Sequence, residues 1–190
     1  MIEIFFLFSS IIISGILSLF AYELNYFKES GFYSFLIFGT IILFSLGLKG
    51  FLPVLFLFLL KFLLISEKED FTDIFSNLIL PSIFSILWYF KRNDIYFYLF
   101  LISLGPHVST TFGKKYKNFL LKSIGCLIGS IIFSFFSLNL KFSIYLIIFS
   151  FTGGAINLII SKFLREKYGN LVSSFISSSI FLLVIGPKYL

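Results

Sequence analysis

The sequence predicts an all-α fold, a polytopic integral membrane helical bundle that crosses the bilayer seven or eight times. Three observations support this prediction. Hydrophobic residues make up 58% of the 190 positions and charged residues 13%, whereas soluble domains contain about 45–50% and about 25%. The mean hydropathy is +1.04. The apolar residues form long runs joined by short connections, so we expect a single transmembrane domain over residues 1–190.

Eight apolar runs have approximately the length of about 17–25 residues that a helix needs to cross a bilayer. In chain order they are Ile2–Tyr22, Phe32–Leu48, Gly50–Ile65, Ile74–Phe90, Ile95–Phe112, Phe119–Leu138, Phe142–Ile160 and Leu171–Pro187. The first run has no basic segment before it and is too long for the apolar region of a signal peptide. We therefore expect it to be retained as a span.

Two features leave the number of spans open. The second and third runs can form one long helix that is kinked around Gly50 and Pro53. The fifth run contains Gly105-Pro106-His107 and can be partly re-entrant. Seven and eight spans are both compatible with the pattern.

The basic residues predict how the bundle is oriented, because they concentrate on the cytoplasmic side of membrane proteins. Two clusters in the connections are therefore placed in the cytoplasm: Lys114, Lys115, Lys117 and Lys122, and Lys162, Arg165 and Lys167. With eight spans, ten of the fifteen basic residues share that side and both termini lie outside. The net charge of +6 then reflects orientation and an anionic lipid surface, and we expect no nucleic-acid partner.

Several classes of site are absent from the sequence. The chain has one His and one Cys, and its acids gather mainly in SEKEDFTD (Ser66–Asp73), so no metal-ligand spacing occurs. It contains no Walker-type loop, no Gly-x-Gly-x-x-Gly and no Gly-x-Ser-x-Gly elbow. We expect no metal or nucleotide cofactor. Cys126 is expected to be a packing residue, and the acidic segment a solvated connector.

Lys49 is the first candidate for a binding site, because it interrupts an apolar run. A lysine near the bilayer centre costs about 2.5–3.5 kcal/mol and marks a functional site by default. Gly50 lets backbone N–H groups approach an anion, and Pro53 suits the first turn of a new helix, so the segment predicts a phosphate cradle. The alternative is a turn lysine whose side chain extends to the lipid headgroups.

Two further pairs of cations and one histidine are candidates as well. Lys91 and Arg92 in YFKRND, and Lys114 and Lys115 in FGKKYKN, can contact phosphate-bearing lipids or substrates. The alternative is that they only orient the protein. His107 is a candidate catalytic group, or else a hydrogen-bonded residue between helices.

Three segments carry a resemblance to a known family. LKGFLPVL, which contains Lys49, resembles the lysine-glycine segment of the bacterial acyl-phosphate:glycerol-3-phosphate acyltransferases. LGPHVSTTFGKKYKNFLLKSIGCLIG is similar to the family's Gly-His and Phe-x-Gly-Gly-Lys-Gly motifs through His107 and Phe112-Gly113. An alternative alignment places FKRN, at 90–93, on the same motif. REKYGNLVSS (Arg165–Ser174) resembles the family's aromatic and Ser-Leu-Ala-Ser segment.

The resemblance implies a multi-pass enzyme of the bacterial inner membrane that needs no metal or nucleotide. Such an enzyme transfers an acyl group from acyl phosphate to glycerol 3-phosphate and produces lysophosphatidate, so these two substrates and membrane lipids are the implied partners. His107 would orient the attacking hydroxyl. The residues implied to bind the two substrate phosphates are Lys49 and Gly50, together with Lys91 and Arg92 or with Lys114 and Lys115.

Two other functions stay open at the level of sequence. ELNYFKESG stands where the family has a glycine-rich loop, which favours a non-catalytic relative or a scaffold that binds anionic lipid. Helices interrupted at Gly50–Pro53 and at Gly105-Pro106 are typical of small transporter components.

Overall fold

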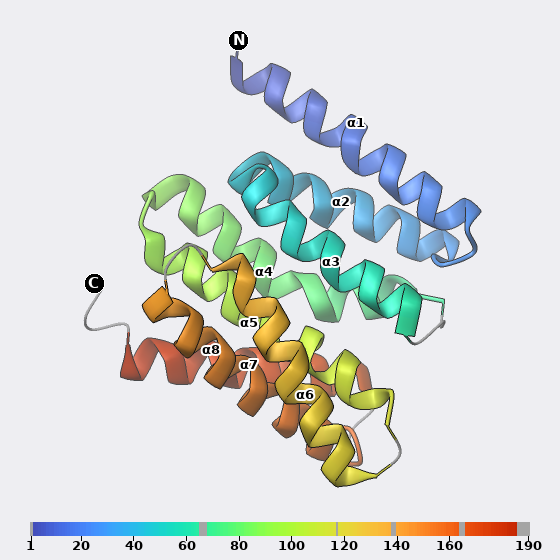
Figure 1. Cartoon of the computed structure of the whole chain (residues 1–190). Coiled ribbons are helices and arrows are strands. Elements are labelled where there is room, and N and C mark those ends of the chain that lie inside the picture. Colours follow the sequence, from blue (N-terminus) through green and yellow to red (C-terminus); the bar gives the residue numbers. More distant parts are fainter. Residues whose placement is uncertain (1, 65–67, 117, 138–139, 164–165, 186–190) are drawn as a thin grey trace.

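The computed structural model is a bundle of helices, and it describes all residues except 1, 65–67, 117, 138–139, 164–165 and 186–190. The described helices are α1 (Ile2–Glu23), α2 (Glu29–Leu46), α3 (Leu48–Leu64), α4 (Phe71–Lys91), α5 (Asp94–Lys114), α6 (Phe119–Phe133), the 3₁₀ helix η1 (Ser134–Phe136), α7 (Leu140–Ile160) and α8 (Glu166–Val184). Consecutive helices run in opposite directions, and α1 lies at one edge of the bundle (Figure 1). The predicted all-α bundle is confirmed, and each predicted span coincides with one helix. The predicted span ends Ile65, Leu138 and Pro187 lie outside the described residues.

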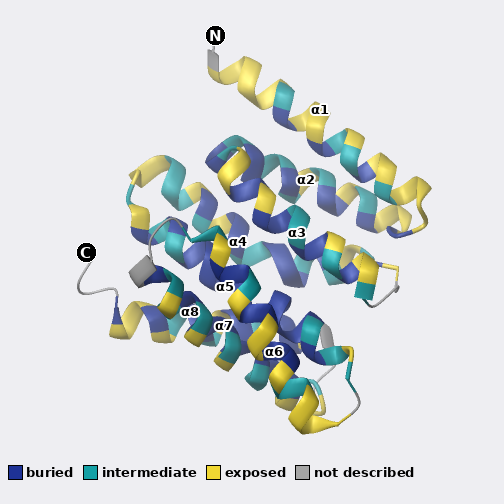
Figure 2. Cartoon of the chain, viewed as in Figure 1, coloured by how far each residue is buried: buried dark blue, intermediate teal, exposed yellow. Residues whose placement is uncertain are grey.

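Six of the described helices are long and apolar enough to cross a membrane: α1, α2, α4, α5, α6 extended by η1, and α7. α3 has 17 residues, and so has the apolar part of α8, Tyr168–Val184. This length is at the lower limit for a span. Many large hydrophobic side chains are exposed on the outside of the bundle, and much of α1 is exposed (Figure 2). The chain is therefore a multi-pass membrane protein.

Polar residues at three connections determine where helices begin. Asp70 accepts a hydrogen bond from the backbone N–H of Asp73, while the Asp73 side chain accepts one from the backbone N–H of Asp70. This reciprocal capping starts α4. Asn93 caps α5 and Asn118 caps α6. In each case the side-chain oxygen accepts one hydrogen bond from a backbone N–H of the first turn. These caps satisfy backbone donors that would otherwise have no partner at a helix start.

The chain reverses direction between α2 and α3 at a single residue, Gly47. Its φ of 64° lies in the left-handed region, which glycine adopts without steric cost. The two runs are therefore separate helices and not one long kinked helix. The break precedes Gly50, and Pro53 is the sixth residue of α3 instead of a first-turn residue. At that position proline lacks the N–H that would bond to the Lys49 carbonyl.

α5 is the centre of the bundle and packs against α3, α4, α6, α7 and α8. In its most apolar stretch 83% of the residues are buried, against 17% in α1 (Figure 2). It continues as one helix through Gly105-Pro106-His107, so the re-entrant alternative is not observed. Small residues permit this close packing, because a side chain on Gly105 would overlap Ser150 of α7.

The two ends of the bundle differ in charge. At one end, which we call the basic end, the connections α1–α2, α3–α4, α5–α6 and α7–α8 meet, the first three on the right-hand side of Figure 1. The lysines with described side chains at the basic end are Lys28, Lys61, Lys68, Lys114, Lys115, Lys122 and Lys162. The described cations of the opposite end are Lys49, Lys91 and Arg92. The arrangement matches the eight-span alternative.

The acidic segment at the basic end is more than a solvated connector. Glu69 is buried, and its Oε1 lies 2.8 Å from Lys61 Nζ in the last turn of α3. The Glu69 N–H donates to the Tyr26 carbonyl, and the Glu69 carbonyl accepts from the Lys28 N–H. A side chain on Gly31 would overlap the Glu69 carbonyl oxygen. These contacts join the α1–α2 and α3–α4 connections.

Candidate functional site

Lys49 and Arg92 both lie against the only tryptophan of the chain, at the opposite end of the bundle. Lys49 Nζ is 4.1 Å from the centroid of the Trp88 ring, and Arg92 Cζ is 4.8 Å from the same centroid. Trp88 Nε1 is buried and has no hydrogen-bond partner among the described atoms. We call these three residues the Trp88 cluster. Nearby, the Tyr89 hydroxyl donates to Glu3 at 3.1 Å.

The cradle predicted around Gly50 does not form as expected. The backbone N–H groups of Gly50 and Phe51 both donate to the Gly47 carbonyl, so they are not free to bind an anion. Gly50 is buried, and a Cβ there would lie 2.5 Å from Leu46 Cβ. Glycine at position 50 therefore permits the tight reversal between α2 and α3, where a larger side chain would overlap Leu46. Lys91 ends α4 beside the Trp88 cluster and is exposed.

The structure does not bring all predicted phosphate ligands together. Lys114 and Lys115 lie in the last turn and at the C-cap of α5, at the basic end. Lys49 contacts the Phe97 ring near the start of the same helix, at 5.1 Å. Because α5 rises 1.5 Å per residue, the two groups are separated by about 25 Å. One phosphate cannot contact both.

His107 lies inside the bundle, nearer to the basic end. It is 1% exposed, and seven residues separate it from Lys114, a rise of about 10 Å. Its Nε2 is 2.8 Å from the Ser174 hydroxyl of α8. Ser174 Oγ also donates to the Ser103 carbonyl of α5 at 2.7 Å. His107 Nδ1 has no hydrogen-bond partner among the described atoms.

Three asparagines form a chain of hydrogen bonds across α4, α7 and α8. Asn157 Nδ2 donates to Asn170 Oδ1 at 2.6 Å, and Asn170 Nδ2 donates to Asn77 Oδ1 at 3.2 Å. All three are buried. The ends of the chain, Asn157 Oδ1 and Asn77 Nδ2, have no described partner. Together with His107 and Ser174, these residues are the polar cluster.

The polar cluster contains buried hydrogen-bonding atoms that have no partner among the described atoms. A buried polar atom without a partner costs about 1–3 kcal/mol, and native structures leave few such atoms. Three atoms of the cluster are buried and have no partner among the described atoms: His107 Nδ1, Asn157 Oδ1 and Asn77 Nδ2. Polar groups inside a membrane protein mark functional sites by default. A ligand with both donors and acceptors would satisfy the three atoms.

Sequence reasoning identified His107 but not its neighbours. Asn77 and Asn157 lie inside predicted spans, and Asn170 directly precedes the last one. Asparagine inside an apolar run is a signal for hydrogen bonds across membrane helices, and this signal was present in the sequence at Asn77 and Asn157. Ser174 lies in the REKYGNLVSS segment, whose Arg165 is outside the described residues.

Comparisons with protein-family models, with curated proteins and with solved structures find no match to this chain.

Proposed function

We propose that this multi-pass protein is an acyltransferase of the bacterial inner membrane that uses the polar cluster as its active site. It moves a fatty acyl group from acyl phosphate to glycerol 3-phosphate and forms lysophosphatidate. The basic end faces the cytoplasm, because cations concentrate on that side. The observation that carries the proposal is the contact of 2.8 Å between His107 and Ser174. It leaves His107 Nδ1 without a partner among the described atoms, about 10 Å along α5 from Lys114.

The site residues have distinct roles in this reaction. The hydroxyl of glycerol 3-phosphate attacks the carbonyl carbon of acyl phosphate, and its proton passes to His107 Nδ1. The bond between the carbonyl carbon and the phosphate oxygen breaks, and inorganic phosphate leaves. Lys114 and Lys115 attract the two phosphate groups at the end of α5. Acyl phosphate is already activated, so positioning supplies much of the catalysis.

Substrate access requires motion. His107 is 1% exposed, and α4, α7 and α8 cover the polar cluster. These helices must separate at the basic end before a hydroxyl can reach His107 Nδ1. Such gating steps commonly limit turnover.

The test is an assay of the purified full-length protein in nanodiscs with acyl phosphate and glycerol 3-phosphate, with lysophosphatidate measured by mass spectrometry. We expect product with the native chain and a loss of at least about 100-fold in His107→Gln, the lower range for general base catalysis. Lys49→Ala is expected to retain activity, because Lys49 is at the opposite end of α5.

Two results would oppose the proposal in different ways. Product that does not exceed that of empty nanodiscs would exclude the activity. Undiminished turnover in His107→Gln, with folding verified by gel filtration, would exclude the polar cluster as its site.

The Trp88 cluster favours a second candidate function, the binding of an anionic lipid without catalysis. Two cations lie within 5 Å of one indole ring centroid, and neither forms an ion pair with a carboxylate of the described residues. The indole N–H adds a donor without an acceptor. A lipid phosphate would accept from all three groups and reduce the repulsion between the cations.

This second function can be measured through Trp88 itself, because its emission is the only tryptophan signal of the chain. We expect the emission to change when phosphatidylglycerol is added to phosphatidylcholine nanodiscs, and the change to disappear in Lys49→Ala. Lys162→Ala is the matched control, because Lys162 lies over the Phe119 ring at the basic end. Equal responses in both variants would argue against a site at Trp88.

A further inference from the structure

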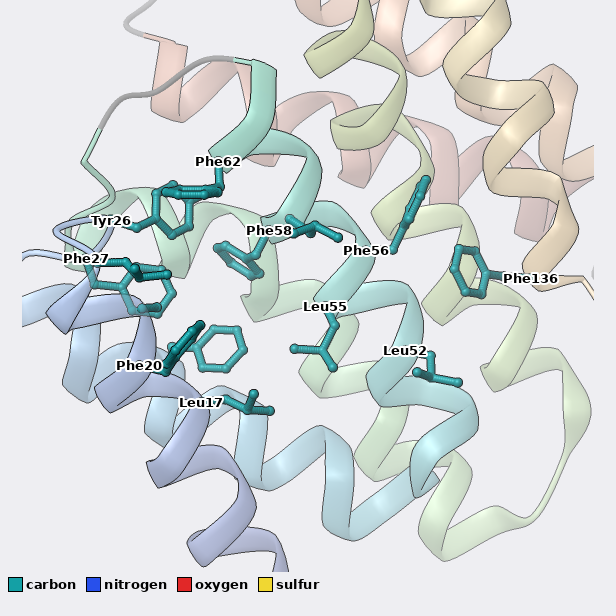
Figure 3. Close-up of a pocket in the computed structure, with 14 residues that line it drawn as sticks. Leu17, Phe20, Tyr26, Phe27, Leu52, Leu55, Phe56, Phe58, Phe62 and Phe136 are labelled. Atoms are coloured by element: carbon teal, nitrogen blue, oxygen red, sulfur yellow. The ribbon is translucent and has the colours of Figure 1, made fainter.

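An apolar crevice with a volume of about 660 Å³ lies between α1 and α3 (Figure 3). Fourteen residues line it: Leu17, Phe20, Ala21, Leu24, Tyr26, Phe27, Phe35, Leu52, Leu55, Phe56, Phe58, Leu59, Phe62 and Phe136. Apart from the Tyr26 hydroxyl, these side chains are entirely hydrocarbon. None of them belongs to the polar cluster, so an occupant of the crevice would be separate from the proposed substrates.

The crevice faces the bilayer. α1 packs on α2 at the edge of the bundle, and only 17% of its most apolar stretch is buried (Figures 1 and 2). From Leu52 to Phe62 the wall extends about 15 Å along α3. One leaflet of the hydrocarbon core is also about 15 Å thick, half of the total. The wall of the crevice therefore extends over a depth similar to the hydrocarbon thickness of one leaflet.

Tyr26 provides a polar contact where the crevice reaches the basic end. Its hydroxyl is buried and has no hydrogen-bond partner among the described atoms. Burial, and then the negative charges of Glu69 and Asp73, raise the pKa of Tyr26 well above its usual range. The phenol therefore stays protonated and is a donor without an acceptor. Tyrosine at this depth meets the ester carbonyl oxygens of glycerolipids, because it concentrates at the membrane interface.

We propose that the crevice binds one acyl chain of a glycerolipid, and that the Tyr26 hydroxyl donates a hydrogen bond to the ester carbonyl of that chain. A helix of a second copy fits less well, because helix contacts in membranes are rich in small residues. Ala21 is the only small side chain among the fourteen lining residues. The proposal does not depend on the acyltransferase activity.

Photocrosslinking tests this proposal on the full chain in phosphatidylcholine nanodiscs. The probe is a phosphatidylcholine with a diazirine in one acyl chain, and adducts are mapped by mass spectrometry. We expect adducts to concentrate on the crevice wall, chiefly between Leu52 and Phe62. Ala21→Trp fills the crevice and should lower their yield several-fold. Leu19→Trp is the control and should leave the adduct yield unchanged, because Leu19 of α1 is 52% exposed and does not line the crevice. Leu55→Trp is a second filling variant in case Ala21→Trp does not fold.

The hydrogen bond has its own test, in which the ester-linked probe is compared with an ether-linked probe that has no carbonyl oxygen. The native chain should give several-fold more adducts with the ester, and Tyr26→Phe should remove that preference. Three results would overturn the proposal: adducts spread evenly over the lipid-facing helices, protein-to-protein crosslinks from the crevice, or equal labelling by both probes in the native chain.

Discussion

At the scale of single residues, Ser174 determines which nitrogen of His107 is available. A hydroxyl carries one proton, and the Ser174 hydroxyl donates it to the Ser103 carbonyl at 2.7 Å. The contact of 2.8 Å with His107 Nε2 must then be donated by the ring. Nδ1 keeps its lone pair, and that lone pair is the acceptor that a general base needs. The tautomer follows from the hydrogen-bond network.

Ser174→Ala tests this positioning role. Without the hydroxyl, the ring loses the contact that holds its Nε2, so we expect kcat to fall at least about tenfold, which corresponds to about 1.4 kcal/mol. The KM for glycerol 3-phosphate should change little. Ser173→Ala is the matched control, because Ser173 is also buried and, among the described residues, its hydroxyl bonds within α8, to the Asn170 carbonyl. A parallel loss in both variants would indicate damage to α8 and contradict the assigned role.

The pair of Lys61 and Glu69 is the residue contact with the largest expected effect on stability. Both side chains are about 10% exposed, and Lys61 Nζ is 2.8 Å from Glu69 Oε1. Removal of one partner from a buried pair costs about 3–5 kcal/mol, because a buried charge stays behind. Glu69→Ala should therefore unfold at a much lower denaturant concentration in a titration with sodium dodecyl sulfate.

The double variant Lys61→Met/Glu69→Leu provides the control for that titration. It replaces both charges by apolar groups of similar length, which is often neutral for a buried pair. We expect it to recover most of the stability lost in Glu69→Ala. Additive losses in the double variant would show that the two side chains do not stabilise each other.

At the scale of helices, the close contact between α5 and α7 depends on two glycines, Gly105 and Gly153. A Cβ on Gly105 would overlap the Ser150 hydroxyl and lie 2.8 Å from Ser150 Cβ. On the facing helix, a Cβ on Gly153 would lie 2.5 Å from Pro106 Cγ. Two helices that approach this closely gain dispersion energy and allow hydrogen bonds across their interface.

Gly105→Ala should destabilise the protein by about 1–3 kcal/mol, the usual cost of overpacking a filled core. The double variant Gly105→Ala/Ser150→Gly should recover part of this loss, because it removes the two Ser150 side-chain atoms that lie nearest to the added methyl group. Gly15→Ala in α1 is the control, since its nearest atom is Leu36 Cδ1 at 3.6 Å. Detergent-unfolding curves that coincide for Gly105→Ala and Gly15→Ala would contradict this account of the interface.

Most of the helices were predictable from the sequence, because the length of an apolar run reports directly on a membrane span. The predicted boundary between the two runs was Lys49, with a kink around Gly50 and Pro53 as the alternative, whereas the chain reverses at Gly47. The candidate site was predictable only in part. His107 was identified, whereas its pairing with Ser174 depends on how α5 and α8 pack, and 67 positions separate the two residues.

At the scale of the whole molecule, the arrangement of the helices sorts the cations into two groups. Lys114 and Lys115 lie near the polar cluster at the basic end, whereas Lys49 and Arg92 surround Trp88 at the opposite end. A linear sequence shows both groups as basic segments beside apolar runs. Their separation by about 25 Å follows from the length of α5. Of the two predicted pairings, the structure places Lys49 beside Arg92 and away from Lys114 and Lys115.

Single-cysteine labelling across the membrane tests this separation most directly. Lys49→Cys and Lys115→Cys, both at exposed positions, are made in a Cys126→Ala background and treated with a membrane-impermeant maleimide. In intact cells we predict that Lys49→Cys reacts and that Lys115→Cys reacts only after permeabilisation. Reaction of both cysteines from the same side would contradict the separation, and reaction of Lys115→Cys in intact cells would contradict a cytoplasmic polar cluster.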